Sequence, residues 1–372
     1  MAQAKRRSTQ APDDRAIGPQ LFSPLRIRGV ELRNRVAMSP MCQYSAVDGL
    51  PSPWHFVHLG SRAAGRCSLV MTEATAVSCV GRISPQDLGI WSDRHAEALA
   101  PVVRFIKEQG SVPGTQLAHA GRKASTHPPW VEGGRPLRPE EGAWPVVGPS
   151  PLPVSDLSPS PLPLTQDGIH EVIEQYRQAG IRALNAGFEV IEIHAAHGYL
   201  LHSFLSSLSN RRTDAYGGSL ENRMRFLVEV VDALRSAIPD RTPLFARISA
   251  SDWVENGWDI DQSVALAKAL APRGVDLIDC SSGGAVPGAR IPLKAGYQVP
   301  FAERIRQEAG IMTAAVGLIT EPVQAEEIIH GGKADLIMLG RSLLRDPYWP
   351  LRAARELGYD IDWPVQYTRA RD

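Results

Sequence analysis

Three side chains that can donate protons or hydrogen bonds stand close together in the sequence, at His194, His197 and Tyr199. They follow the largely apolar, β-branched run Val190–Ile193, which is typical of a buried strand. Two imidazoles and a phenol at one strand end could hold a polar group and protonate an atom beside it. Either histidine alone would more often be a core residue, but the three together favour a site.

Two chemistries are open to these residues. A zinc site needs at least three protein ligands, and no H-E-x-x-H motif or Cys/Asp cluster completes one around His194 and His197. Two imidazole donors directed at one carbonyl oxygen would instead stabilise negative charge developing there. Tyr199 would be protonated at neutral pH and could act as a general acid. A serine hydrolase is disfavoured, because the sequence has no G-x-S-x-G elbow.

The elements that must position this site alternate along the chain. Strands are expected at Val36–Met41, Leu69–Ala76, Val112–Leu117, Val190–His194, Leu244–Ile248, Leu277–Cys280, Met312–Val316 and Leu336–Leu339. Helices are expected at His55–Arg66, Arg94–Gln109, Asp167–Ala186, Leu220–Ala237, Gln262–Ala271, Phe301–Ala309, Glu321–His330 and Tyr348–Leu357. This alternation predicts an α/β protein with a single (β/α)8 TIM barrel.

An open, doubly wound sheet is the rival topology. It would carry a G-x-G-x-x-G motif after its first strand, where this chain has Ser39-Pro40-Met41-Cys42. The barrel is therefore preferred. Residues 1–18 are polar and are expected to be a disordered tail, which leaves 19–372 as one domain.

Two additions to the barrel are expected. Leu25–Arg33 alternates apolar and polar residues around a glycine, which predicts an N-terminal β-hairpin. Residues 128–163 hold eleven prolines and follow the third strand, which makes them too long for an ordinary βα connection. This proline-rich insertion could be a lid or substrate rim, or a passive surface excursion.

Composition limits the classes of partner. Lys plus Arg (40) equals Asp plus Glu (40), so charge gives no reason to expect nucleic acid or a membrane surface. No apolar run approaches the length of a membrane span, and no apolar stretch follows Lys5–Arg7 as in a signal peptide. The four cysteines show no C-x-x-C spacing, which favours reduced thiols in a cytoplasmic protein.

In a barrel, chemistry lies at the carboxyl ends of the strands. Gln116 offers an amide suited to the edge of a pyrimidine-like ring. Gly317 and Gly340-Arg341 follow the last two strands, where barrels frequently bind phosphate. The first two strands and the fifth end in further candidates: Ser39, Pro40, Met41, Cys42, Tyr44, Glu73, Ala74 and Ser249.

Arg247 stands at the inner end of the fifth strand, where a charge needs a partner. An anion that forms on a cofactor during turnover would provide one. An internal ion pair with Glu192 or Glu73 is the alternative.

Several motifs together resemble those of the old yellow enzyme family. They run in family order from Leu21 to Arg369 and include Ser39–Tyr44, Thr72–Ala76, Gln116–Lys123, Ile191–Tyr199, Ser209–Gly218, Ala246–Ser249 and Leu339–Arg341. Cys42 and the His-Ala-Ala-His pair resemble the thermophilic-like subgroup. The resemblance implies FMN over the barrel mouth, reduced by NADPH or NADH and reoxidised by an electron-poor alkene.

The resemblance also implies roles for individual residues. Those expected to contact FMN are Ser39, Pro40, Met41, Cys42, Ala74, Gln116 and Arg247 around the ring and Gly317, Gly340 and Arg341 at the phosphate. His194 and His197 would bind the substrate carbonyl, and Tyr199 would protonate the α-carbon. Tyr44 would pack against the substrate, and Cys42 would tune the flavin potential.

The C-terminal stretch Gln366–Arg369 resembles the subgroup's segment that inserts an arginine into a neighbouring subunit's site. The resemblance thus implies a homodimer or homotetramer in which Arg369 reaches a partner's substrate.

The resulting hypothesis is an FMN-dependent NAD(P)H oxidoreductase that reduces activated C=C bonds by a ping-pong mechanism. Two alternatives remain at this point: a flavin-free barrel isomerase acting on a phosphorylated substrate, and a non-catalytic protein that stores or senses FMN.

Overall fold

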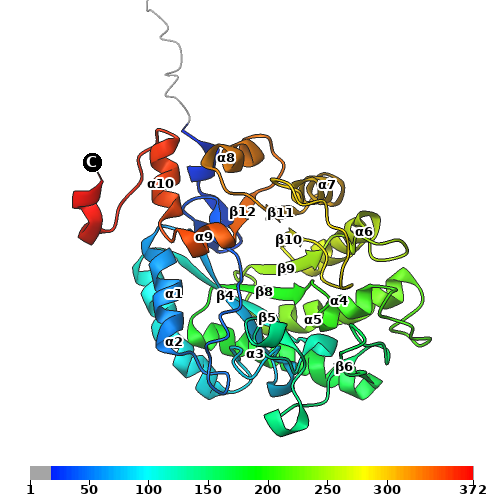
Figure 1. Ribbon diagram of the computed structural model, residues 1–372. Helices are drawn as coiled ribbons and strands as arrows, with labels where there is room; N and C mark the ends of the chain where they lie inside the picture. Colours follow the sequence, from blue (N-terminus) through cyan, green and yellow to red (C-terminus); the bar gives the residue numbers. More distant parts are fainter. Residues whose placement is uncertain (1–17, 372) are drawn as a thin grey trace, which may run out of the picture.

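The computed structural model describes residues 18–371, so all of the predicted tail except Gly18 lies outside the described residues. Eight parallel strands close into a barrel in the order β10-β11-β12-β3-β4-β5-β8-β9, with helices around it (Figure 1). The predicted (β/α)8 barrel is confirmed. Its strands are β3 (Val36–Met38), β4 (Leu69–Ala76), β5 (Val112–Ala118), β8 (Val190–Ala195), β9 (Leu244–Ser249), β10 (Leu277–Ser281), β11 (Met312–Ala315) and β12 (Leu336–Leu339).

The strand bounds differ from expectation mainly at the first strand, which was expected to reach Met41 but ends at Met38. Ser39 still donates its backbone N–H to Leu339 O at 3.0 Å. Pro40 follows and has no N–H to continue the ladder. The chain therefore leaves the barrel there and carries Met41 and Cys42 over its mouth as a loop.

The eight predicted helices all form, within about two residues at most ends. They are α1 (Pro53–Ala64), α2 (Asp93–Glu108), α3 (Gln166–Ala186), α5 (Leu220–Ala237), α6 (Ile260–Leu270), α7 (Val299–Ala309), α8 (Pro322–His330) and α10 (Trp349–Glu356). Side-chain caps fix several starts, as where Thr165 accepts a hydrogen bond from Gly168 N at 3.1 Å. Two short helices were not predicted, α4 (Leu200–Leu205) and α9 (Arg341–Arg345), because neither is long enough to show a helical period.

The predicted hairpin is present as the antiparallel pair β1 (Leu25–Ile27) and β2 (Val30–Leu32). Its inward side chains join the apolar cluster that closes the barrel opposite the carboxyl ends of the strands. Besides these hairpin residues, the cluster includes Leu69, Met71, Val112, Val190, Phe245, Leu277, Leu336 and Met338. The closed end of the barrel is thus apolar, which leaves polar groups for the other end.

The proline-rich insertion has its own short parallel pair, β6 (Val147–Gly148) and β7 (Leu162–Pro163). In Figure 1 the insertion lies at the edge of the barrel near α4. The C-terminal segment ends in a short 3₁₀ helix, η7 (Val365–Ala370), which projects beyond α10. Among residues 18–371, no helix has the length and apolar character needed to cross a membrane.

Phe245 is fully buried in the apolar cluster at the closed end. Phe245→Ala should lower the free energy of unfolding by about 3–5 kcal/mol, because it removes a large buried side chain and leaves a cavity. Val323→Ala is the matched surface control, since Val323 is 57% exposed, and should change stability by less than about 0.5 kcal/mol. Urea denaturation followed by circular dichroism measures both; equal losses would contradict this description of the core.

Candidate active site

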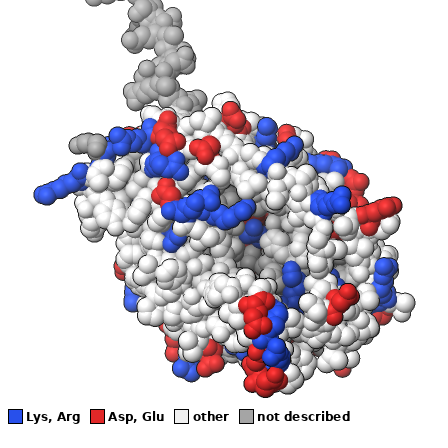
Figure 2. All heavy atoms as spheres, viewed as in Figure 1, with Lys and Arg blue, Asp and Glu red and all other residues white. Residues whose placement is uncertain are grey.

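Polar side chains gather where the barrel strands end. Figure 2 shows this face hollowed at its centre, with basic atoms in and around the hollow. The structure brings together almost all the residues that the sequence suggested, from β3, β4, β5, β8, β9, β11 and β12 and the loops after them. The exception is Arg369, which is exposed on η7 at the edge of the molecule.

The turn after β8 holds the two histidines and the tyrosine. His197 has a left-handed backbone (φ 59°), which is costly for a residue with a Cβ. Ser249 Oγ accepts a hydrogen bond from His197 N at 2.9 Å, and Lys123 Nζ donates to His197 O at 2.8 Å. Side chains from the end of β9 and from the segment after β5 therefore stabilise this conformation.

Gly198 allows the same turn to pack closely against the loop after β10. It has φ 75°, and a Cβ there would lie 2.5 Å from Gly284 O. Gly198 N donates to His202 Nδ1 at 2.8 Å, and His202 Nε2 lies 3.3 Å from Asp252 Oδ1. A buried His–Asp pair thus supports the turn from behind.

The ring of His194 lies 5.1 Å from that of His197 and 5.0 Å from that of Tyr199, each edge to face. His194 Nδ1 accepts a hydrogen bond from Ala196 N at 3.2 Å, which assigns the proton to Nε2 in the neutral ring. Burial first, and then the charge of Arg247, hold the pKa of His194 well below its usual range. His194 is therefore a neutral N–H donor at physiological pH.

His197 has a partner that the sequence analysis missed. Its Nε2 lies 2.7 Å from Ser281 Oγ at the end of β10. Burial and Arg247 also lower the pKa of His197 well below the usual value. When Ser281 donates to Nε2, the proton of the neutral ring is on Nδ1, which can then donate to another atom.

Tyr199 stands at the start of α4, beside an apolar wall that includes Cys42 and Tyr44. Burial raises its pKa well above the usual value, and Cys42, Tyr44 and Asp87 add to the effect. The Lys123 ammonium lies 5.0 Å from the centre of the Tyr199 ring. Burial likewise raises the pKa of the Cys42 thiol. Both residues are therefore neutral at physiological pH, the phenol as an acid and the thiol as a poor nucleophile.

Arg247 lies on the floor of the site and does have an internal partner, but neither of those that the sequence suggested. Its Nη1 lies 3.4 Å from Asp279 Oδ2 and donates to Ser39 Oγ at 2.8 Å. Glu192 instead accepts a hydrogen bond from Gln116 Nε2 at 2.8 Å. Glu73 lies 3.0 Å from His55 Nε2. Burial and the neighbouring Asp279 raise the pKa of Glu192 to about 8.

This floor suits a ligand with an acceptor-rich edge. Arg247 Nε is buried and has no hydrogen-bond partner among the described residues. The Gln116 amide keeps a second N–H and its oxygen beyond the bond to Glu192. A guanidinium with an unused donor beside an amide matches the pyrimidine edge of a flavin, including the negative charge that a reduced flavin carries.

The glycine positions suit the phosphate end of such a ligand. Gly317 has φ 116°, and a Cβ there would lie 2.7 Å from Gln298 Nε2. Gly340 and Arg341 begin α9 directly after β12, the neighbour of β11 in the sheet. The two backbone segments therefore leave the barrel side by side. Together with the floor, they make the residues present a fit for FMN.

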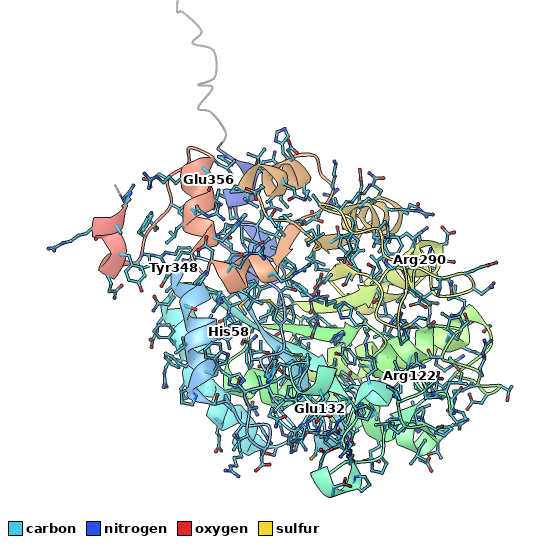
Figure 3. The ribbon with its side chains drawn as sticks, in the orientation of Figure 1. His58, Arg122, Glu132, Arg290, Tyr348 and Glu356 are labelled. Atoms are coloured by element: carbon cyan, nitrogen blue, oxygen red, sulfur yellow. The ribbon has the colours of Figure 1, made fainter. Side chains whose placement is uncertain are left out.

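The proline-rich insertion contributes to the rim. Trp130 packs edge to face on Tyr44, with ring centres 5.4 Å apart. Arg122, labelled in Figure 3, donates to Leu152 O in the insertion and to Ala285 O after β10. The insertion is thus fixed to the barrel and borders the site.

Sequence reasoning missed three functional candidates, Ser281, Asp279 and Lys123. Ser281 and Asp279 lie on β10, and the rule that chemistry sits at strand ends would have flagged Ser281 had it been applied there. Lys123 lies inside a recognised motif, but its contact with the His197 carbonyl depends on the folded turn.

Comparisons with known proteins agree with this geometry. The NADH:flavin oxidoreductase / NADH oxidase family matches residues 20–359. The chain is 51% identical to an NADPH dehydrogenase of Geobacillus thermodenitrificans over 351 residues, covering 94% of this chain and 98% of that protein. It is 49% identical to an NADPH dehydrogenase of Bacillus subtilis over 352 residues, covering 94% of this chain and 98% of that protein.

The solved structure of morphinone reductase is also similar, with a TM-score of 0.76, 29% identity, and coverage of 93% of this chain and 92% of that one. The chain belongs to the NADH:flavin oxidoreductase / NADH oxidase family, the family of old yellow enzyme, and is an FMN-dependent oxidoreductase with a reduced nicotinamide as its electron donor.

Proposed function

We propose that the protein is an ene-reductase that uses NADPH to reduce the activated C=C bond of α,β-unsaturated carbonyl compounds. One observation carries the proposal. Two neutral imidazoles and a protonated phenol meet at the open end of the barrel, with ring centres 5.1 and 5.0 Å from His194. The names of the relatives support NADPH as the donor.

FMN, when bound, supplies the two-electron chemistry between the nicotinamide and the alkene. The residues that would hold its ring are Ser39, Pro40, Met41, Cys42, Ala74, Gln116 and Arg247, and those at its phosphate are Gly317, Gly340 and Arg341. In this arrangement the Arg247 guanidinium would stabilise negative charge at the pyrimidine edge, because its buried Nε–H has no other hydrogen-bond partner among the described residues.

The two histidines bind the substrate carbonyl oxygen. His194 donates from Nε2, and His197 donates from Nδ1 while Ser281 donates to its Nε2. Because both rings are neutral, binding requires no prior protonation. The two donors withdraw charge through the carbonyl, which makes the β-carbon electrophilic and stabilises the enolate-like transition state.

Tyr199 protonates the α-carbon, and Tyr44 packs against the substrate on the side of Trp130. The raised pKa of Tyr199 keeps its proton in place until carbanion character develops at the α-carbon. Product leaves before the next nicotinamide binds, which gives a ping-pong order.

We also propose a cytoplasmic homodimer or homotetramer. In the single chain Arg369 is exposed at the edge of the molecule, where it is available to enter the substrate site of a neighbouring subunit.

The purified protein should be yellow and should oxidise NADPH faster when cyclohexenone is added. Visible absorbance and NADPH consumption under exclusion of oxygen measure the two properties. A flavin-loaded protein whose NADPH oxidation cyclohexenone does not stimulate would contradict ene-reduction while leaving the family assignment in place.

His194→Ala combined with His197→Ala should slow reoxidation of the reduced enzyme by cyclohexenone on the order of 100-fold, because both carbonyl donors are lost. Stopped-flow absorbance separates this step from reduction by NADPH. His330→Ala, at an exposed position on α8, is the control. Unchanged reoxidation in the double variant would remove the histidines from substrate binding.

Tyr199→Phe should slow reoxidation by weakly activated enones on the order of 100-fold, since the phenol's proton is lost while the ring remains. Flavin reduction should change much less. Tyr359→Phe is the matched control, because Tyr359 is 39% exposed and lies far from the mouth, against Phe22. Equal slowing of both half-reactions would contradict the acid role.

A further inference from the structure

A buried carboxyl group that the proposed mechanism does not use lies behind Tyr199. Asp87, in the loop after β4, is only 2% exposed. Its Oδ2 accepts a hydrogen bond from Ile83 N at 2.7 Å, and its Oδ1 accepts from Ser84 Oγ at 2.8 Å and from Ser84 N at 3.2 Å. No basic side chain forms an ion pair with it among residues 18–371.

Asp87 and Tyr199 line one small cavity, together with Ala74, Ala76, Gly81, Ile83, Ala118 and Ala120. Its volume is about 10 Å³, room for a single water molecule. Asp87 and Tyr199 are the residues in this lining whose side chains can exchange a proton, since the others are alanine, glycine and isoleucine. One water molecule there would connect the carboxyl to the phenol.

We propose that Asp87 is the internal proton source for Tyr199, acting through one water molecule in this cavity. The inference rests on the proposed function, in which Tyr199 protonates the substrate. A ligand over the barrel mouth would cover the open side of Tyr199, whereas the cavity reaches it from the side of the β4 and β5 ends and the loops that follow them.

The proton transfers balance without any electron transfer. The Tyr199 O–H bond breaks as a C–H bond forms at the α-carbon of the substrate. The water gives a proton to the phenolate oxygen and takes one from the Asp87 carboxyl. The Asp87 carboxylate then regains a proton from solvent before the next turnover.

Asp87 titrates in the range that this role requires. Burial raises its pKa to about 7, against the opposing effect of the Ser84 and Ile83 hydrogen bonds. The acid form is therefore present at neutral pH and is lost as the pH rises through about 7. The rate of reoxidation by an enone should therefore fall as the pH rises through about 7.

The other titratable groups around Asp87 and Tyr199 are Glu73, Cys42, Tyr44, His119, Lys123 and His194. The ring of His194 lies 5.0 Å from that of Tyr199, and burial holds its pKa well below the usual value. Burial raises the pKa values of Cys42 and Tyr44 and lowers that of His119 to about 4. Glu73 is paired with His55. Burial lowers the pKa of Lys123 to about 8, and the pKa of Glu192 on the floor of the site is raised to about 8, so these two groups are the competing explanations for a pH dependence near neutrality.

Two substitutions separate these groups. Asp87→Asn keeps the shape and an acceptor oxygen but cannot supply a proton, so reoxidation by cyclohexenone should lose its dependence on pH near 7 and become at least about tenfold slower at pH 6. Ser84→Ala removes a hydrogen bond that stabilises the carboxylate, which raises the Asp87 pKa. It should move the midpoint upward by about 0.5–1 pH unit while retaining the rate at low pH. If the pH profile loses its midpoint in Asp87→Asn and the midpoint rises in Ser84→Ala, the titrating group is neither Lys123 nor Glu192.

Asp93→Asn is the matched control for charge, because the Asp93 side chain is 85% exposed, and it should leave the profile unchanged. Infrared difference spectra between low and high pH give a second readout that does not depend on turnover. They should contain a protonated carboxyl band that Asp87→Asn removes and that Ser84→Ala retains to higher pH.

The inference would be overturned if the pH profile of reoxidation kept the same midpoint in both Asp87→Asn and Ser84→Ala. It would also be overturned if Asp87→Asn left the infrared difference spectra unchanged. If the wild-type enzyme were not reoxidised by enones, the proposed function would fail instead, and the infrared band would still report whether Asp87 titrates near neutrality.

Discussion

The arrangement of the site depends on one backbone conformation, the left-handed geometry of His197. Were this residue in an extended conformation, the chain after β8 would not bring His194, His197 and Tyr199 to one point. Its cost is offset by the hydrogen bond that His197 N donates to Ser249, at the end of β9, and by the one that Lys123, in the segment after β5, donates to His197 O. The closed barrel supplies these partners, so the fold is a condition for the turn.

Burial has opposite consequences for the two levels of the site. At the mouth it keeps the imidazoles and the phenol neutral, which is the form that each needs as a donor. On the floor it places Arg247 against Asp279 and near Glu192. Burial also raises the pKa of Glu192, to about 8. The net charge of the floor, beneath the edge of a bound ligand, is therefore set by Arg247, Asp279 and Glu192 together and not by Arg247 alone.

Much of this could be predicted from sequence, because the barrel depends on periodic patterns that are local in the chain. The strand ends and the order of the motifs located His194, His197, Tyr199, Gln116 and Arg247. The partners of these residues could not be found in the same way. Arg247 pairs with Asp279 from the neighbouring strand, a contact set by barrel register, and the role of Lys123 exists only once the β8 turn has formed.

The anchoring of the proline-rich insertion has a consequence for how the enzyme can diversify. Arg122 joins it to the barrel by donating to Leu152 O in the insertion and to Ala285 O after β10, and Arg212 donates to Pro149 O within the insertion and to Leu164 O just after it. Guanidinium groups that bind main-chain oxygens are indifferent to the side chains of the segment they hold. The rim of the site can therefore accept new sequences and lengths during evolution while the barrel beneath it, and the chemistry it supports, stay the same.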